Sequence, residues 1–341
     1  MKKILVVLLA LAMVFSMAAC GKKEAEDPKV LEDSLVIYTT HAEALVQAVA
    51  DAFEAETGVK VEFINLKGEL ASRVEAEKDN PQADIMYGGD SAIYQRLKAE
   101  GCYAVTAPAW AGDLNPAFKD AEGYFYGTIK TPVMMFYNTE KLSADQAPKD
   151  WADLIQPQYL NQIVTRDSLS SSMKSCMCAL IYHYGEDNGF NYLKDLDINI
   201  KNYYNSGSMM YEAVGKGEAT VSIAVLSDIV SQHDKGLPFE AIDAVSGSPI
   251  LTDCIAALNK APHPNAAAAF VEFAGSAKVQ AMLAKDFNKI PSLDAALADS
   301  PAWMATSVKP MDLDWSVISQ NQTSWLNKWE TDVINTSKNL K

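Results

Sequence analysis

Short apolar runs alternate with helical apolar stripes from residue 34 onward. The run LVIY at 35–38 predicts a strand, and the apolar positions of residues 45–53 share one face of a helix that Gly58 ends. Further strands are predicted at 59–64 and 83–87, each followed by a helical pattern. This succession is typical of βαβ units built around a mostly parallel sheet.

The same alternation resumes after residue 130. We predict further strands at 131–137, 162–165, 220–225 and 250–258. The apolar residues between Met173 and Ile181 share a helix face, and an alanine-rich helix follows Pro264. The fold class is therefore α/β.

Small polar residues gather at the corners where predicted strands turn into helices. Such corners face ligands in open α/β sheets, and the free N–H groups of a helix start attract anions. The candidate binding residues are Thr39, Thr40 and His41; Glu69; Ser91; Arg166, Ser168, Ser170, Ser171 and Ser172; Ser206, Gly207 and Ser208; and Asp228.

A purely structural interpretation of these corners stays open. Ser and Thr before a helix are most often N-caps, and Thr40 with Glu43 fits a capping box. Arg166 could pair with a surface carboxylate. His183, His233 and His263 lack metal-ligand spacing, so we interpret them as structural.

Length and charge narrow the class of partner. The 341 residues suffice for two domains of ordinary size. A formal net charge of -15 argues against nucleic acid and against an anionic membrane surface, because both select faces rich in Lys and Arg. A small anion held in a local cleft is compatible with this charge.

The first 33 residues have the composition of an export signal and a tether. Residues 1–19 combine two lysines, an apolar stretch and a small-residue end, as in a secretory signal peptide. Cys20 follows in a context that resembles the bacterial lipobox, in which this cysteine is lipidated. Residues 20–33 are charged and apolar-poor, which suits a flexible tether. We expect an extracytoplasmic protein that is lipid-anchored to the outer face of the bacterial cytoplasmic membrane.

The other four cysteines are Cys102, Cys176, Cys178 and Cys254. Cys176 and Cys178 are two apart in a helical pattern and so point to different faces, which disfavours a mutual disulfide or a shared metal. We expect buried free thiols, because cysteine usually behaves as a small hydrophobe.

Four segments together resemble the extracellular solute-binding proteins of ABC importers, in the branch that binds ferric iron, sugar phosphates or phosphonates. They are LVIYTTHAEAL, AFEAETGVKVEF, QADIMYGGDSAIYQRLKAEG and APHPNAAAAFVEFAGSAKVQAML. The resemblance implies a two-lobed periplasmic-binding-protein fold of type II, with hinge strands between the lobes near residues 130–138 and 245–257. It implies that residues 34–132 with about 255–300 form lobe 1, and 133–254 with about 301–341 form lobe 2.

The resemblance also offers ferric iron as a ligand. His41 and Glu69 fall where that branch has its histidine and glutamate ligands, but the stretch expected to hold two tyrosines is SIAVLSD at 222–228. Ferric iron is hard and prefers phenolate or carboxylate oxygen. The serine-rich corners fit a phosphorylated sugar or an aminophosphonate better, with Arg166 as a bidentate contact and Glu69 or Asp228 on the organic portion.

A secreted hydrolase is the alternative of another class. The chain has no G-x-S-x-G elbow, H-E-x-x-H helix, Walker A loop or dinucleotide fingerprint. We therefore expect a protein that is not an enzyme, uses no cofactor, acts as a monomer and has two partners, a small anionic ligand and an ABC permease.

Overall fold

The computed structural model describes residues 30–168, 170–305 and 308–334. The predicted signal peptide and the predicted lipidation site Cys20 lie outside the described residues. All elements below belong to the unit Glu32–Lys341. Within the described ranges, no helix is long and apolar enough to cross a membrane.

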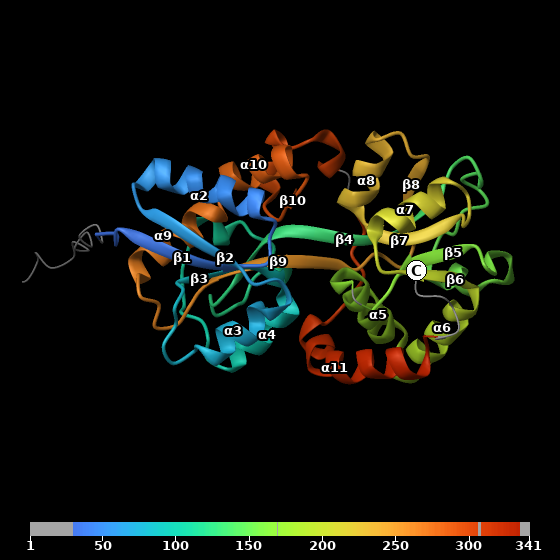
Figure 1. The fold of residues 1–341 in the computed structure, drawn as a ribbon, viewed down its shortest axis with the longest axis horizontal. Helices are drawn as coiled ribbons and strands as arrows, with labels where there is room; N and C mark the ends of the chain where they lie inside the picture. The colour runs from blue at the N-terminus through green and yellow to red at the C-terminus, as the bar shows by residue number, and fades with distance from the viewer. Residues whose placement is uncertain (1–29, 169, 306–307, 335–341) are drawn as a thin grey trace, which may run out of the picture. The chain divides into compact units, whose positions relative to one another are not determined.

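The elements follow one another as strands and helices in alternation (Figure 1). The strands are β1 Ser34–Thr39, β2 Lys60–Asn65, β3 Ile85–Asp90, β4 Tyr126–Asn138, β5 Ile163–Arg166, β6 Ile200–Tyr204, β7 Val221–Val225, β8 Phe239–Ile242, β9 Ile250–Ala257 and β10 Ile290–Pro291. The α-helices are α2 Glu43–Thr57, α3 Leu70–Ala76, α4 Ser91–Ala99, α5 Ser171–Tyr184, α6 Glu186–Asn199, α7 Gly207–Gly215, α8 Leu226–Asp234, α9 Pro264–Ala274, α10 Ala277–Phe287 and α11 Trp315–Asp332. The 3-10 helices are η2 Lys67–Glu69, η3 Ala109–Gly112, η4 Pro116–Phe118, η5 Trp151–Ile155, η6 Pro157–Tyr159, η7 Asp294–Asp299 and η8 Ala302–Ala305.

The described strands form one mixed sheet in the order β2-β1-β3-β9-β4-β7-β5-β6, with β8 and β10 also pairing β4. The pairs β1–β2, β1–β3 and β5–β6 are parallel, whereas β3–β9, β4–β9 and β4–β7 are antiparallel. The predicted parallel pairing therefore holds toward the two ends of the sheet. The middle is antiparallel because β4 and β9 cross it in opposite directions (Figure 1).

Strand β4 belongs to both halves of this sheet. Its residues up to Pro132 pair with β9, and those from Val133 pair with β7. We call the β1, β2 and β3 side with α2–α4, α9 and α10 the first lobe, and the β5–β8 side with α5–α8 the second lobe. The residue bounds assigned to the lobes from the sequence stay a prediction.

Helices cover both faces of each lobe (Figure 1). In the first lobe, α2 packs with α9 and α10, while α3 and α4 pack together on the other side. In the second lobe, α5 packs on α6, and α8 packs on β8. Helix α11 contacts both α4 and α5, and the hydroxyl of Ser319 donates to the carbonyl of Ala92 at 2.9 Å. This helix therefore joins the lobes a third time, beside the two crossing strands.

Several elements follow the sequence prediction, and others were missed. Gly58 ends α2 in the left-handed conformation as predicted, and the four described cysteines are buried and free. Helix α6 was missed because Asn188 and Gly189 look like a turn. Gly189 instead allows close packing, since a Cβ there would lie 2.6 Å from the Cα of Ile181 in α5.

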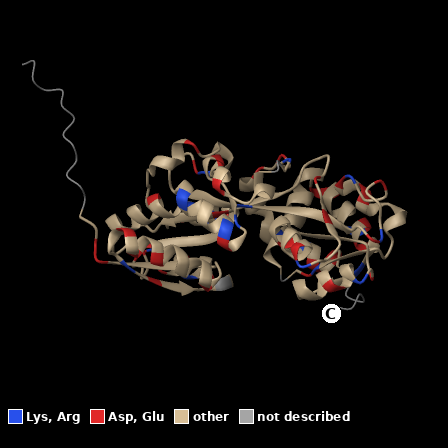
Figure 2. Ribbon diagram, turned by 90° about the horizontal axis from the view of Figure 1, so that it is seen from above, with Lys and Arg blue, Asp and Glu red and all other residues tan. Residues whose placement is uncertain are grey.

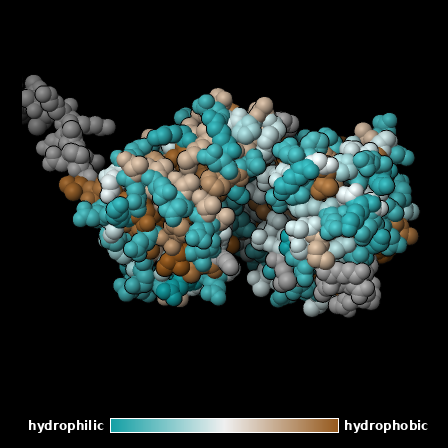
Figure 3. All heavy atoms as spheres, turned by 45° about the horizontal axis from the view of Figure 1, so that its top comes forward, coloured by the Kyte–Doolittle hydropathy of each residue, from teal (hydrophilic) through white to brown (hydrophobic). Residues whose placement is uncertain are grey.

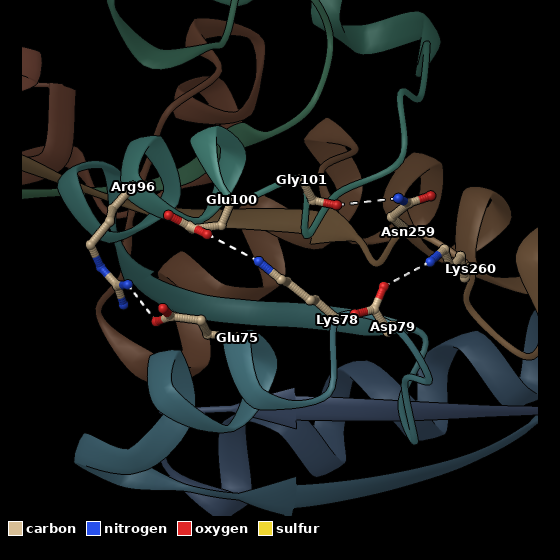
Figure 4. A network of polar contacts seen from close by, with 8 residues as sticks. All are labelled: Glu75, Lys78, Asp79, Arg96, Glu100, Gly101, Asn259 and Lys260. Atoms are coloured by element: carbon tan, nitrogen blue, oxygen red, sulfur yellow. Dashed lines mark hydrogen bonds and ion pairs between the residues drawn. The ribbon is translucent and has the colours of Figure 1, made fainter.

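Lys, Arg, Asp and Glu residues occur along the ribbon of both lobes (Figure 2). One surface network joins α3, α4 and the turn after β9 (Figure 4). It contains the pairs Arg96–Glu75 at 2.5 Å, Lys78–Glu100 at 3.0 Å and Lys260–Asp79 at 3.0 Å, and a hydrogen bond of 3.2 Å from Asn259 to the carbonyl of Gly101. Because these ion pairs are exposed, each contributes at most about 1 kcal/mol.

A buried carboxylate holds the first lobe more strongly. Asp84 is fully buried and accepts hydrogen bonds from the backbone N–H of Val36 at 2.8 Å and of His263 at 2.7 Å. The same carboxylate lies 3.0 Å from Nδ1 of His263. It thereby ties β1 and the start of α9 to β3.

Replacing Asp84→Asn should destabilise the protein, because an amide NH₂ would then face N–H donors inside the core. We expect a loss of about 1–3 kcal/mol in the free energy of unfolding, measured by urea denaturation. Asp79→Asn is the matched control, since the Asp79 side chain is 88% exposed, and its effect should stay within about 1 kcal/mol. Equal losses in the two variants would contradict this role of Asp84.

Candidate functional site

A cavity of about 630 Å³ lies where helices α2, α3, α4, α5 and α8 begin. Figure 3 shows the surface hollowed between the two lobes. We call this cavity the cleft. It is lined by Thr40, His41, Ala42, Gly68, Leu70, Ala71, Gly89, Asp90, Ile93, Thr131, Ser171, Ser172, Ser175, Val225, Ser227, Asp228, Leu251, Asp253 and Lys289.

The corner between β1 and α2 is held from inside. Thr39 is fully buried, and its hydroxyl accepts from the backbone N–H of His41 at 3.0 Å. The side-chain amide of Asn65 donates to the carbonyl of His41 at 2.7 Å. The predicted capping box of Thr40 and Glu43 is wrong: the N-cap of α2 is Ala42, which has no side-chain acceptor. The start of α2 is therefore open to another acceptor.

His41 presents a neutral imidazole to the cleft. Burial, together with the charge of Lys289, lowers its pKa to about 3. The ring packs edge-on against Tyr87 with a centroid distance of 4.7 Å. Within the described residues, Nε2 is buried without a hydrogen-bond partner. A buried polar atom without a hydrogen-bond partner destabilises the folded protein unless a ligand or water supplies the hydrogen bond.

Gly88 lets the β3–α4 corner approach this histidine. Its φ is +96°, and a Cβ would lie 2.7 Å from the hydroxyl of Thr40 and 3.0 Å from the His41 ring. The glycine is thus required twice, for its backbone conformation and for space.

Two aspartates face each other on the floor of the cleft. Asp90 at the end of β3 and Asp253 in β9 are cross-strand partners. Burial raises the pKa of both carboxyl groups, that of Asp253 to about 6. Lys289, just before β10, opposes the rise at Asp253, while the neighbouring Asp90 adds to it. The pair is therefore short of positive partners and suited to accept hydrogen bonds from a ligand.

Helix α5 supplies the opposite wall. Ser170 caps the helix by accepting from the N–H of Met173 at 3.4 Å, so its hydroxyl is used internally. Ser171 and Ser172 in the first turn line the cleft. One turn later, the hydroxyl of Ser175 donates to the Asp90 carboxylate at 3.3 Å, which links the two lobes across the cleft.

Asp228 in the first turn of α8 also lines the cleft, and its role as a ligand contact stays a prediction. The hydroxyl of Tyr211 donates to its carboxylate at 3.2 Å. The N-cap of α8 is Val225, which carries no side-chain acceptor.

Several sequence-predicted binding residues do not line the cleft. Glu69 is exposed, although its neighbours Gly68 and Leu70 are lining residues. Arg166 uses its guanidinium to donate to the carbonyls of Tyr204 at 3.2 Å and Asn205 at 3.0 Å. The remaining residues outside the lining are Thr39, Ser91, Ser168, Ser170, Ser206, Gly207 and Ser208. The corners at 39–41 and 168–172 thus meet at one cavity, and that at 206–208 does not.

Sequence reasoning did not select six polar lining residues, namely Asp90, Thr131, Ser175, Ser227, Asp253 and Lys289. One signal was present: Asp253 is a lone carboxylate within the apolar strand 250–258. Lys289 gave no signal, because only the folding back of the chain after α10 brings it to the cleft.

The described part of the chain offers no evident metal centre. No three His, Cys, Asp or Glu side chains lie there in a group that could hold a metal ion. His41 and Glu69, the two iron ligands suggested by the sequence, differ in exposure, since His41 is buried and Glu69 exposed.

Comparisons with known proteins agree on the kind of molecule. Residues 80–321 match the family described as "Bacterial extracellular solute-binding protein". The "Probable ABC transporter periplasmic-binding protein y4fP" of Sinorhizobium fredii is 29% identical over 338 residues, which cover 94% of this chain and 92% of that protein. The "Iron uptake protein A1" of Synechocystis is 24% identical and covers 71% of each chain.

Among solved structures, the periplasmic binding protein AfuA from Actinobacillus pleuropneumoniae, with exogenous fructose-6-phosphate bound, has a TM-score of 0.74 at 27% identity. The alignment covers 89% of this chain and 99% of that one. The predicted two-lobed fold of type II periplasmic binding proteins is thereby confirmed.

Replacing Gly88→Ala should destabilise the β3–α4 corner, because a strained backbone and a Cβ clash with Thr40 arise together. We expect a loss of about 1–3 kcal/mol in the free energy of unfolding by urea denaturation. At Gly112, φ is not positive and a Cβ would meet nothing within 4 Å, so Gly112→Ala should change the stability little. A stable Gly88→Ala protein would show that the corner can relax.

Asp253 should make the protein less stable as pH rises. Its carboxyl keeps a proton up to about pH 6 when folded, against 3.8 as its ordinary value. The unfolded chain loses this proton first, so the stabilising difference is complete below about pH 4 and is lost by about pH 6. Asp253→Asn should remove this slope and gain on the order of 1–3 kcal/mol at pH 7.

The measurement is urea denaturation at several pH values between 4 and 8, taken as the difference between variant and wild type. That difference removes the opposite contribution of His41, whose lowered pKa costs stability as pH falls below its ordinary 6.5. Asp312→Asn, on an exposed carboxylate, serves as control. Parallel pH curves for Asp253→Asn and wild type would refute the shift.

Proposed function

This chain belongs to the bacterial extracellular solute-binding protein family, and from that premise we propose that its cleft captures a small phosphorylated solute for an ABC importer. The solute is a phosphorylated sugar or an aminophosphonate. The protein delivers it to a permease in the membrane and does not itself catalyse a reaction.

The single observation that carries this proposal is the meeting of five helix starts at one cavity, since Leu70 and Ala71 at the start of α3 also line it. Helices α2, α4, α5 and α8 each place first-turn or N-cap residues in the lining. Each start carries unpaired N–H groups and the positive end of the helix dipole. Ala42 and Val225 cannot cap α2 and α8 with their side chains, so these two starts keep donors for a ligand.

Side chains around these helix starts suit phosphate oxygens. Ser171 and Ser172 add hydroxyl donors, and Lys289 adds a cation. The neutral His41 can donate from Nε2 without bringing a buried charge. An anion bound here would satisfy the imidazole nitrogen that otherwise lies buried without a partner.

The acidic side of the cleft suits the organic portion of the solute. Asp90, Asp228 and Asp253 are acceptors for sugar hydroxyls or for an ammonium group. Asp90 and Asp228 already accept hydrogen bonds from Ser175 and Tyr211, and an inorganic anion alone would add no donor for the remaining carboxylate oxygens. The structure of AfuA with bound fructose-6-phosphate, at 27% identity, supports a ligand with both parts.

Ferric iron is the second candidate, supported by relatives such as Iron uptake protein A1. His41 and three aspartates line the cleft, although no three such side chains among the described residues are grouped closely enough to hold a metal ion. The first turn of α8 offers Ser227 and Asp228 where the iron-binding branch is expected to have tyrosines, which favours the phosphorylated solute.

The lobes act as a clamp in this proposal. The solute binds one wall and the second lobe then closes on it by bending at β4 and β9, which shifts the population toward the closed form. A signal peptide at 1–19, a lipid on Cys20 and a tether at 20–33 would hold the monomeric protein at the outer face of the cytoplasmic membrane, beside its permease.

Binding to the folded protein raises its melting temperature by mass action, so a thermal-shift panel tests the ligand class. The panel contains fructose 6-phosphate, 2-aminoethylphosphonate, inorganic phosphate and ferric citrate. We expect a shift with an organic phosphate or phosphonate that exceeds the shift with inorganic phosphate. A shift with ferric citrate alone would replace the proposal by iron binding.

His41→Ala and Ser171→Ala should each lower the affinity for the ligand found in the panel about tenfold or more. The reason is that a hydrogen bond to a charged group contributes about 1.5–3 kcal/mol. Calorimetric titration measures the affinity. Ser168→Ala is the matched control, because Ser168 is a neighbouring serine outside the lining. Unchanged affinity in both test variants would remove these two residues from the site.

A further inference from the structure

A second cavity of about 290 Å³ lies behind the crossing strands. We call it the back cavity. It is lined by Lys130, Pro132, Leu226, Ile250, Ile290, Asp294, Leu297, Met304, Ala305 and Val308. Its residues come from β4, α8, β9 and the segments after α10, so both lobes contribute to its walls.

The back cavity and the cleft lie on opposite faces of the same strands. In β4, Thr131 lines the cleft, while its neighbours Lys130 and Pro132 line the back cavity. In β9, Leu251 lines the cleft and Ile250 the back cavity. The register agrees, because Thr131 pairs with Leu251 and Pro132 with Ile250, and successive strand residues point to opposite faces.

The same division occurs at two further places. Val225 lines the cleft and Leu226 the back cavity, and Lys289 lines the cleft and Ile290 the back cavity. A molecule in the back cavity would therefore touch the connections on which the two lobes turn.

The chemistry of the back cavity is that of an amphiphile site. Its walls are mostly aliphatic, and Lys130 brings a half-buried ammonium group. Burial lowers the pKa of Lys130, although the negative charge of Asp294 works against this. The Lys130 ammonium lies 6.0 Å from the ring centre of Phe118, and Asp294 is exposed to solvent. The negative charge that acts on this ammonium comes from Asp294, which is solvated. A carboxylate bound in the cavity would place an anion close to the ammonium.

We propose that the back cavity binds a small amphiphilic monocarboxylate of the size of a medium-chain fatty acid. Its carboxylate contacts Lys130, and its alkyl chain lies along Pro132, Leu226 and Ile250. The cavity volume sets the upper limit on the chain, because a longer alkyl tail would remain in water.

Calorimetric titration of the whole chain with octanoate, below its micelle concentration, tests the site. We expect binding of one octanoate per chain, weakened about tenfold or more for hexanoate, because each buried methylene strengthens binding roughly threefold to fourfold. 1-Octanol, which lacks the carboxylate, should bind at least tenfold more weakly than octanoate. Equal binding of all three compounds, or no saturable binding, would overturn the proposal.

Variants locate the binding. Lys130→Met keeps most of the apolar part of the side chain and removes its charge, and it should weaken octanoate binding at least tenfold. Leu297→Trp should fill the cavity and abolish octanoate binding. This variant tests the site independently of whether Lys130→Met folds. Lys216→Gln is the control on an exposed lysine and should bind like wild type. Octanoate affinity that survives in a folded Leu297→Trp protein would place the ligand elsewhere.

Backbone amide exchange gives a readout that does not depend on any cleft ligand. Octanoate should slow exchange in β4 and β9, where the strands form the cavity wall. Unchanged exchange in both strands would exclude a site against the crossing strands. None of these experiments uses a phosphorylated solute. Absence of octanoate binding would therefore leave the proposed function intact, and failure of the proposed function would leave the octanoate site intact.

Discussion

The antiparallel pairing of β4 with β9 is the constraint on which the rest of the structure depends. Six residues of β4 pair with β9 before β4 continues into the second lobe alongside β7. Both lobes therefore share one continuous set of strand-to-strand backbone hydrogen bonds. The cleft lies where these strands pass between the lobes. The same strands present Thr131 and Leu251 to the cleft and Pro132 and Ile250 to the back cavity. Bending at this place necessarily changes both cavities.

Burial of polar groups in the cleft lowers the stability of the folded protein when no ligand is bound. His41 is kept neutral, and its Nε2 has no hydrogen-bond partner in the described part of the chain, while Asp90 and Asp253 are neighbours with raised pKa values. Ser175 reaches across from the second lobe to one of these carboxylates. The solute that we propose, with both an anionic group and hydrogen-bond donors, would relieve these costs together.

Residues that seemed to be ligand contacts can instead position those that line the cleft. Arg166 holds the carbonyls at the end of β6 and in the turn that follows. Helix α7 begins directly after this turn and carries Tyr211, whose hydroxyl donates to Asp228 in the lining. The polar corner at 206–208 therefore does not line the cleft. It begins the helix whose Tyr211 positions a lining residue.

Sequence by itself determined the strands and helices with strong periodicity, the free thiols and the solute-binding family, because these depend on local patterns of apolar, small and turn-forming residues. It also indicated the corners of His41, Ser171 and Asp228, since a strand-to-helix turn is a local signal. Only the tertiary structure decided that Asp253 and Lys289 join them, and that Glu69 and Arg166 stay outside the lining. The physical reason is that a cleft is assembled from segments up to 249 residues apart, Thr40 and Lys289, and the pairing of distant strands fixes which side chains face it.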